Sequence, residues 1–269
     1  MKNAPNSKSN LDRALQRFAG DSVRANGLRG QMANAIVAQM IGDGVVKGGS
    51  GLRFRYGEKF TRVTMDLDTA WKTGLDVFLK LLKERLAAGW NGFSGEVKVL
   101  AQAKSRGIPF DYVMQPCDVK LKYLGIPWFT VQFEVGHNES GDVDELPSEL
   151  LDSFAFLALP NPSPIPAMRL EYQIAQKLHG ASAPSSKRSH DLVDLQLIMA
   201  AGGVDVGKTA ELCRSLFKYR KGHAWPPRIG KGEGWEATYN DQKGGLPVLP
   251  TIDEAVAWAN GLIEKIDKA

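Results

Sequence analysis

The chain has 269 residues and a formal net charge of +4, and 43% of its residues are hydrophobic and 24% charged. These are the values of a globular protein, and the length allows one large domain or two modest ones. No run approaches the roughly 18 apolar residues that span a bilayer, and the polar N-terminus lacks the apolar region of a secretory signal. Cys117 and Cys213 alone make no disulfide framework, so we expect a cytoplasmic protein without membrane association.

The first half of the chain combines helical and extended patterns. Apolar residues recur at helical spacing from about residue 11 to 19 and from about 29 to 41, which predicts two helices. Residues 45–47 suit a short strand, and a long amphipathic helix is expected from about residue 69 to 90. The block that follows predicts antiparallel strands at 95–103, 117–123 and 128–135.

A turn followed by a pair of carboxylates carries the strongest chemical signal. Gly49 and Ser50 lie in a Gly-Gly-Ser turn, which offers backbone N–H groups at a predicted helix N-terminus, where phosphate binds well. Residues 62–68 alternate as a strand does, so Asp66 and Asp68 would point to one face about 7 Å apart. Two like charges at that spacing favour a bound cation such as Mg²⁺. The stretch therefore predicts a phosphate cradle and a metal-binding pair.

Each part of this signal also has a plainer explanation. A Gly-Gly-Ser sequence is commonly only a turn, and two alternating aspartates are commonly solvated. Their order along the chain is what makes the combination specific. Glu134, near the end of the strand predicted at 128–135, is the candidate third carboxylate, and a solvated strand glutamate is its alternative.

The second half of the chain is predicted to be mainly helical. Four prolines in the nine residues 159–167 indicate a stiff linker, which divides the chain into domains at 1–160 and 161–269. Periodic patterns beyond the linker predict helices at about 169–180, 190–201, 208–219 and 252–266. Lys177 and Asp191 fall on two of these helices, and an ordinary interhelical salt bridge is the plainer interpretation of that pair.

Residues 202–209 fit the P-loop pattern GxxxxGK[ST]. That pattern binds phosphate only when a strand feeds the loop and a helix leaves it. The preceding segment has a helical period, so we reject a P-loop at this position.

A basic stretch follows, in which residues 214–231 hold six Lys or Arg and no acidic residue. Phe217, Tyr219 and Trp225 are interleaved with these cations. Cations for phosphate and rings for unpaired bases would suit RNA. A solvated surface with Trp225 packed inside explains the same pattern.

Taken in order, these motifs resemble the nucleotidyltransferase AbiEii toxin family, which includes the MenT-like toxins. The resemblance covers most of the chain, to about residue 239, and it rests on four blocks whose joint order and spacing are specific. The matching residues are Lys47–Gly49 with Leu52–Gly57; Arg62, Thr64, Asp66 and Asp68; Glu171, Ala175 and Lys177; and Arg188, Asp191, Leu192, Asp194 and Leu195.

The resemblance implies an α+β fold. It would have a DNA polymerase β-like nucleotidyltransferase core of mixed or antiparallel sheet with helices, and a helical C-terminal domain that completes the active-site cleft. The implied catalytic residues are Asp66, Asp68, Lys177 and Asp191, and the implied metal ligands are Asp66, Asp68 and Glu134. The implied nucleotide-binding residues are Lys47, Gly49, Ser50, Lys177, Arg188 and Asp194.

The resemblance also implies a function. A toxin of this kind would use Mg²⁺ to transfer a nucleoside monophosphate from an NTP to an RNA acceptor, expected to be the 3′ end of tRNA. Pyrophosphate would be released, translation and growth would stop, and a cognate antitoxin would restrain the enzyme. The alternative is an NTP-binding toxin that sequesters or modifies a protein partner without modifying tRNA.

Overall fold

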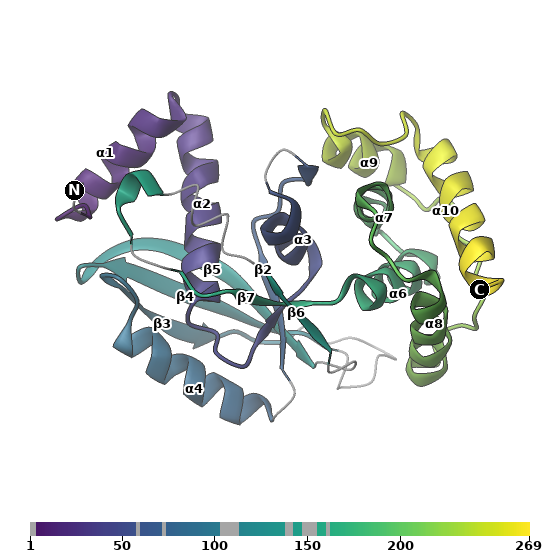
Figure 1. Ribbon diagram of the computed structural model, residues 1–269, viewed down its shortest axis with the longest axis horizontal. Coiled ribbons are helices and arrows are strands. Elements are labelled where there is room, and N and C mark those ends of the chain that lie inside the picture. Colours follow the sequence, from purple (N-terminus) through teal and green to yellow (C-terminus); the bar gives the residue numbers. More distant parts are fainter. Residues whose placement is uncertain are drawn as a thin grey trace. The chain divides into compact units, whose positions relative to one another are not determined.

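A computed structural model describes the protein at residues 4–57, 60–71, 74–102, 113–137, 142–146, 155–159 and 162–269. The chain divides into two compact units, and Figure 1 shows its elements in sequence colours. Unit 1 comprises Met1–Arg55 and Thr64–Ala167, and unit 2 comprises Tyr56–Val63 and Met168–Ala269. The chain therefore enters unit 2 for a short segment and returns to unit 1 just before the two aspartates.

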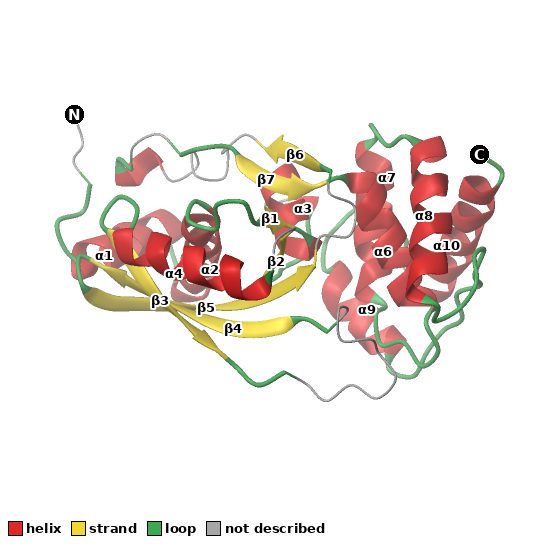
Figure 2. Cartoon of the chain, turned by 90° about the horizontal axis from the view of Figure 1, so that it is seen from below, coloured by secondary structure: helices red, strands yellow, loops and turns green. Residues whose placement is uncertain are grey.

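Unit 1 is built on a mixed sheet with the strand order β3-β4-β5-β2-β1-β7-β6, drawn in yellow in Figure 2. The strands are β1 Val45–Val46, β2 Leu67–Trp71, β3 Phe93–Val99, β4 Gln115–Tyr123, β5 Ile126–His137, β6 Val143–Leu146 and β7 Ile165–Met168. β1 is antiparallel to β2 and parallel to β7, whereas β2 is parallel to β5. β3, β4 and β5 pair in the antiparallel fashion that their alternating sequences predict.

The sheet of unit 1 is accompanied by helices. They are α1 Lys8–Ala19, α2 Ser22–Ala38, α3 Gly48–Tyr56 and α4 Leu75–Ala88, with a 3-10 turn at Ala155–Leu157. α2 packs on β5 and α4 packs on β3. α2 is almost fully buried from Leu28 to Ala38. Its own apolar and small residues lie on all faces of the helix rather than along one stripe. It thereby forms part of the hydrophobic core of this unit.

The expectation of a strand from residue 62 is wrong in its first part, because β2 begins only at Leu67. Asn34 Nδ2 donates to the Met65 carbonyl oxygen at 3.3 Å, and Ser50 Oγ donates to the Asp66 carbonyl oxygen. These two carbonyls bond side chains of α2 and α3 in place of a neighbouring strand. Asp66 therefore lies immediately before the strand and Asp68 within it.

The long helix expected from residue 69 also begins later than predicted. Thr69, Ala70 and Trp71 remain in β2, where they pair with β5. The helix α4 starts at Leu75 and ends at Ala88. Sheet pairing has overridden the helical period in the first residues, as tertiary context commonly does.

Unit 2 is helical after residue 168 (red in Figure 2), and its helices are α6 Leu170–Ser182, α7 His190–Ala201, α8 Val206–Arg220, α9 Trp235–Lys243 and α10 Ile252–Asp267. The helices predicted in this region are confirmed. α9 was not anticipated, because only Trp235 and Tyr239 on it are buried and its apolar pattern is correspondingly weak. None of the helices in the described ranges of either unit has the length and apolar character to span a bilayer.

The rejection of a P-loop at residues 202–209 is confirmed. The segment before it is the helix α7, which ends at Ala201 and is followed by Gly202 with a φ of 77°. Asp205 caps α8 by accepting a hydrogen bond from the backbone N–H of Lys208 at 2.9 Å. A carboxylate thus already occupies the helix N-terminus at which a phosphate would have to bind.

Candidate functional site

The start of α3 lies against the segment that carries the two aspartates. Gly48 has a φ of 61°, and a Cβ built there would come within 2.3 Å of Asp68 Oδ2. Glycine is therefore required both for the backbone conformation and for the close approach of this carboxylate. Ser50 is buried, and its hydroxyl donates to the Asp66 carbonyl oxygen. The backbone N–H of Lys47 donates to the Asp68 carbonyl oxygen at 2.9 Å.

These contacts show what the residues of the predicted phosphate-binding turn bind within the protein. The hydroxyl hydrogen of Ser50 is committed to the Asp66 carbonyl, so this side chain holds the aspartate segment. The Lys47 ammonium lies 3.4 Å from Met114 Sδ, which is a weak acceptor. Gly49 is buried in the first turn of α3. Nucleotide binding by these residues stays a prediction.

Two of the three predicted metal ligands lie on adjacent strands, and the third, Asp66, directly precedes one of them. Asp68 of β2 and Glu134 of β5 are direct partners in the parallel register, and both are half-buried, whereas Asp66 is exposed. Hard carboxylate oxygens of this kind suit Mg²⁺, which takes one or two carboxylates and keeps several waters. In the part of the chain that the structure describes, no three His, Cys, Asp or Glu side chains are already arranged to hold a metal ion. Metal binding by these three carboxylates also stays a prediction.

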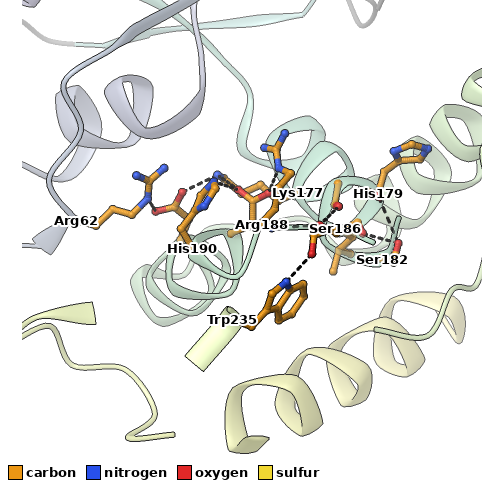
Figure 3. A network of polar contacts seen from close by, with 12 residues as sticks. Arg62, Lys177, His179, Ser182, Ser186, Arg188, His190 and Trp235 are labelled. Atoms are coloured by element: carbon orange, nitrogen blue, oxygen red, sulfur yellow. Dashed lines mark hydrogen bonds and ion pairs between the residues drawn. The ribbon is translucent and has the colours of Figure 1, made fainter. Parts of the chain in front are cut away.

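Unit 2 brings together five charged side chains in an alternating series, seen in Figure 3. Asp194 lies between Arg62 and Lys177, with its oxygens 3.0 Å from Arg62 Nε and 2.6 Å from Lys177 Nζ. Asp191 lies between Lys177 and Arg188, with its oxygens 2.9 Å from Lys177 Nζ and 2.6 Å from Arg188 Nε. We call these five residues the ion-pair chain.

The ion-pair chain is buried at its centre and carries a positive excess. Asp191 and Asp194 are 0% and 1% exposed, and Lys177 is 4% exposed. Burial alone would raise the pKa of Asp191, but Arg188 and Lys177 outweigh it and hold that pKa well below its ordinary value. Burial also lowers the pKa of the adjacent His190, which Asp191 only partly offsets, so this imidazole is neutral at pH 7. Three cations therefore face two carboxylates.

Such a buried network is poor evidence for stability, because taking charges out of water costs about as much as their attraction returns. A net positive charge held in place by buried carboxylates is, however, suited to an anionic ligand. Perturbed titrations of this kind concentrate at functional sites.

The Arg188 side chain, which binds Asp191, passes directly over Gly180 of α6, where a larger residue would block it. A Cβ on Gly180 of α6 would lie 2.8 Å from Arg188 Nε. Ser186 Oγ supports the turn, since it donates to the Gly180 carbonyl oxygen at 2.8 Å and accepts from the Arg188 N–H at 3.2 Å. Trp235 Nε1 in turn donates to the Ser186 carbonyl oxygen at 2.6 Å (Figure 3). The Arg188 side chain nevertheless stays 52% exposed, so a ligand can reach it.

The aromatic residues of the basic stretch do not all face solvent. Phe217 is buried, and Trp225 packs against it with ring centroids 5.3 Å apart. Trp225 Nε1 also donates to Asp267 Oδ1 at 2.7 Å. For these two rings the structural interpretation is correct, whereas Tyr219 is 52% exposed and can stack on a ligand.

The predicted residues gather in two sets, one in each unit. Unit 1 holds Lys47, Gly49, Ser50, Asp66, Asp68 and Glu134, and unit 2 holds Lys177, Arg188, Asp191 and Asp194. Arg62 joins the second set although it was not a predicted site residue, and it had been named only among the residues that match the family pattern. Gly180 gave no signal, because a glycine near a helix end ordinarily predicts only a C-cap.

Comparison with known proteins identifies relatives of the chain. A family model described as the nucleotidyl transferase AbiEii toxin of type IV toxin–antitoxin systems matches residues 35–259. Among solved structures, MenT4, a nucleotidyltransferase toxin from Mycobacterium tuberculosis H37Rv, is 15% identical with a TM-score of 0.55, over 95% of this chain and 98% of that chain. JHP933 from Helicobacter pylori is 14% identical with a TM-score of 0.46, over 88% and 89% of the two chains. No curated protein sequence matches.

Proposed function

Because the chain belongs to the nucleotidyl transferase AbiEii toxin family of type IV toxin–antitoxin systems, we propose that it transfers a nucleoside monophosphate from an NTP to the 3′ end of tRNA. The acceptor hydroxyl attacks the α-phosphate, and pyrophosphate leaves. The modified tRNA no longer supports translation, so growth stops unless a cognate antitoxin restrains the enzyme. The observation that carries the proposal is the presence of both a carboxylate segment at β2 and a positively charged ion-pair chain.

The carboxylate side is suited to a divalent cation. Asp66 and Asp68, with Glu134 as the third carboxylate, would hold Mg²⁺, which when bound neutralises triphosphate charge and favours ionisation of the attacking hydroxyl. Gly48 and the backbone N–H of Lys47 fix Asp68 before any ligand arrives. This fixed arrangement lowers the reorganisation needed during the reaction.

The cationic side neutralises phosphate. Phosphoryl transfer depends mainly on positioning and on stabilising charge that develops on the phosphate oxygens and the leaving group. Lys177 acts as a point charge, and the exposed guanidinium of Arg188 can bind phosphate oxygens in a bidentate manner. Asp191 holds Lys177 with one carboxylate oxygen and Arg188 with the other, and Asp194 adds a second contact to Lys177.

Arg62 of the ion-pair chain and Asp66 are close in the sequence. Only Val63, Thr64 and Met65 separate Arg62, which belongs to the ion-pair chain, from Asp66. Arg62 is bonded to Asp194, and the Asp66 carbonyl is bonded to Ser50, so each end of this short segment is held.

RNA is the proposed acceptor because the surface at the C-terminal end of α8 offers both kinds of contact that single-stranded RNA uses. Lys218 and Lys221 are exposed on either side of Tyr219, whose ring is itself half exposed. Lysines neutralise phosphates, and an exposed ring stacks on an unpaired base.

Incubation of the purified protein with each of the four α-labelled NTPs, Mg²⁺ and total tRNA tests the proposal. We expect label in tRNA with the wild-type chain and none with Asp66→Ala or Lys177→Met. The same gel resolves proteins, so label in a protein band with no label in tRNA would favour the alternative of a protein-modifying toxin. Tight NTP binding without any labelled product would favour a sequestering toxin.

A further inference from the structure

One helical turn of α2 holds Met65, the residue directly before Asp66. Asn34 Nδ2 donates to the Met65 carbonyl oxygen at 3.3 Å. A Cβ on Gly30 would lie 3.4 Å from Met65 Cε, so the Met65 methyl group lies close to the helix surface at Gly30. Gly30 and Asn34 are four residues apart and share one face of the helix. We call these two residues the Met65 seat.

The Met65 seat is not ordinary core packing. The Met65 side chain stays 52% exposed, so seating it buries little apolar surface. Asn34 is 4% exposed, and its Oδ1 atom is buried without a hydrogen-bond partner. An unsatisfied buried oxygen costs about 1–3 kcal/mol, so an apolar side chain of similar size would make a more stable core here. The Asn34 amide is therefore better explained by its hydrogen bond to the Met65 carbonyl than by a contribution to the stability of the fold.

The seat is one of several tethers on the aspartate segment. The carbonyl oxygens of Met65, Asp66 and Asp68 accept hydrogen bonds from Asn34, from Ser50 and from the backbone of Lys47, respectively. Asn34 is the only one of these three donors that comes from α2. The Met65 carbonyl belongs to the planar peptide that ends at the Asp66 nitrogen, so holding this carbonyl restricts the backbone from which the Asp66 side chain projects.

We propose that Asn34 is a positioning residue which, by fixing the peptide between Met65 and Asp66, aims the Asp66 carboxylate for divalent-metal binding. This inference rests on the proposed role of Asp66 as a metal ligand. Both residues of the seat lie before residue 35, where the family match begins, so the match does not supply this role.

The full chain labelled with ¹³C at its methionine methyl groups gives a direct test. The Met65 signal is assigned with Met65→Leu, and Mn²⁺ is titrated in the presence of a non-hydrolysable NTP analogue. Mn²⁺ bound at Asp66 broadens the nearby Met65 signal, so the midpoint of broadening measures metal affinity at this site.

The variant tested is Asn34→Leu, and Asn34→Asp replaces it if the leucine variant does not fold. The matched control is Gln39→Leu, which removes another amide at the end of α2 that donates to a backbone carbonyl, that of Ser163, at 3.0 Å.

We expect Asn34→Leu to shift the Met65 signal and to raise the Mn²⁺ midpoint about tenfold, as loss of a group that orients a metal ligand does. Gln39→Leu should change neither. The inference is overturned if Asn34→Leu behaves like Gln39→Leu while Asp66→Ala abolishes broadening. Failure of the proposed function looks different: broadening would then be the same in Asp66→Ala and in the wild-type chain.

Discussion

Asp66 combines an exposed carboxylate with a backbone that is held from two helices. Asp68, in contrast, lies within β2, and its carboxylate rests on the start of α3. The chemistry of Asp66 can thus be removed without disturbing the fold, since its side chain contributes little burial.

We therefore predict that Asp66→Ala abolishes nucleotidyl transfer and leaves the free energy of unfolding within about 0.5 kcal/mol of wild type, as surface substitutions ordinarily do. Urea unfolding and the labelled-NTP assay measure the two quantities. Asp43→Ala, at another exposed acidic residue of unit 1, should leave both unchanged. A large loss of stability in Asp66→Ala would show that this carboxylate has a structural role instead.

Gly180 offers a way to move Arg188 without removing it. The methyl group of Gly180→Ala would meet the Arg188 side chain, which is flexible and can swing away from Asp191. We expect a several-fold rise in KM for NTP with a smaller change in kcat, because the phosphate-binding cation is displaced. Gly261→Ala in α10 is the control, because nothing lies within 4 Å of its added methyl. Equal kinetics in the two variants would remove Arg188 from the nucleotide site.

At the scale of elements, α6 and α7 hold the ion-pair chain together. Lys177→Met would leave Asp191 and Asp194 buried without their shared cation. Breaking one partner of a buried ion pair costs about 3–5 kcal/mol, so the variant should unfold at much lower urea. The double variant Lys177→Met/Asp194→Asn removes one of the two stranded charges and should recover part of that stability.

Activity in these two variants separates a structural lysine from a catalytic one. Transfer should be absent in both, although the double variant regains part of the lost stability. If transfer returned together with stability, Lys177 would act only as a structural ion pair.

The packing of α6 against α8 makes stability depend on pH. The His179 and His223 rings have centroids 4.7 Å apart, and Ser182 Oγ lies 2.7 Å from His223 Nε2. Burial, with Arg220 and His223 adding to it, lowers the pKa of His179 to about 4 from an ordinary 6.5, and burial also lowers the pKa of His223. The folded state therefore keeps both rings neutral at pH values where the unfolded chain binds protons.

Stability should accordingly be complete above pH 6.5 and decline as the pH falls toward 4. The lowered pKa of Asp191 also makes the protein less stable as the pH falls. Its contribution to stability is lost at still lower pH than that of the histidines. Thermal unfolding between pH 4 and 8 measures this slope, and His179→Gln should flatten it. An unchanged slope in that variant would assign the dependence to other groups.

Sequence periodicity predicted most of these elements, including the starts of α7 and α10, but it misplaced the starts of β2 and α4. The helices α6, α7, α8 and α10 of unit 2 and the antiparallel strands of unit 1 are regular in hydrophobic pattern and were predicted, whereas α9 was not. The start of β2 was misplaced, because Asn34 and Ser50 take the carbonyls of Met65 and Asp66. Side-chain bonds from distant helices leave no periodic trace in the local sequence. Arg62 was missed for the same reason, since its partner Asp194 lies 132 residues away.

At the scale of the whole molecule, the basic stretch is where the acceptor should bind. We predict that Lys218→Ala/Lys221→Ala weakens RNA binding without changing NTP binding. Each phosphate contact that is lost should lower the slope of log K against log salt by about 1. Lys231→Ala is the control, because Lys231 is paired with Glu236 at 3.4 Å and Asp253 at 3.3 Å. Unaltered RNA affinity in the double variant would place the acceptor on another surface.

As a nucleotidyl transferase, the chain should transfer a nucleotidyl group rather than a phosphoryl group. The most direct measurement compares the fate of label from α-labelled and γ-labelled NTP in the same reaction with tRNA and Mg²⁺. We predict that the α label enters tRNA and that the γ label is recovered in pyrophosphate. Recovery of the γ label in tRNA or in a protein, with the α label left in a nucleoside diphosphate, would contradict the account.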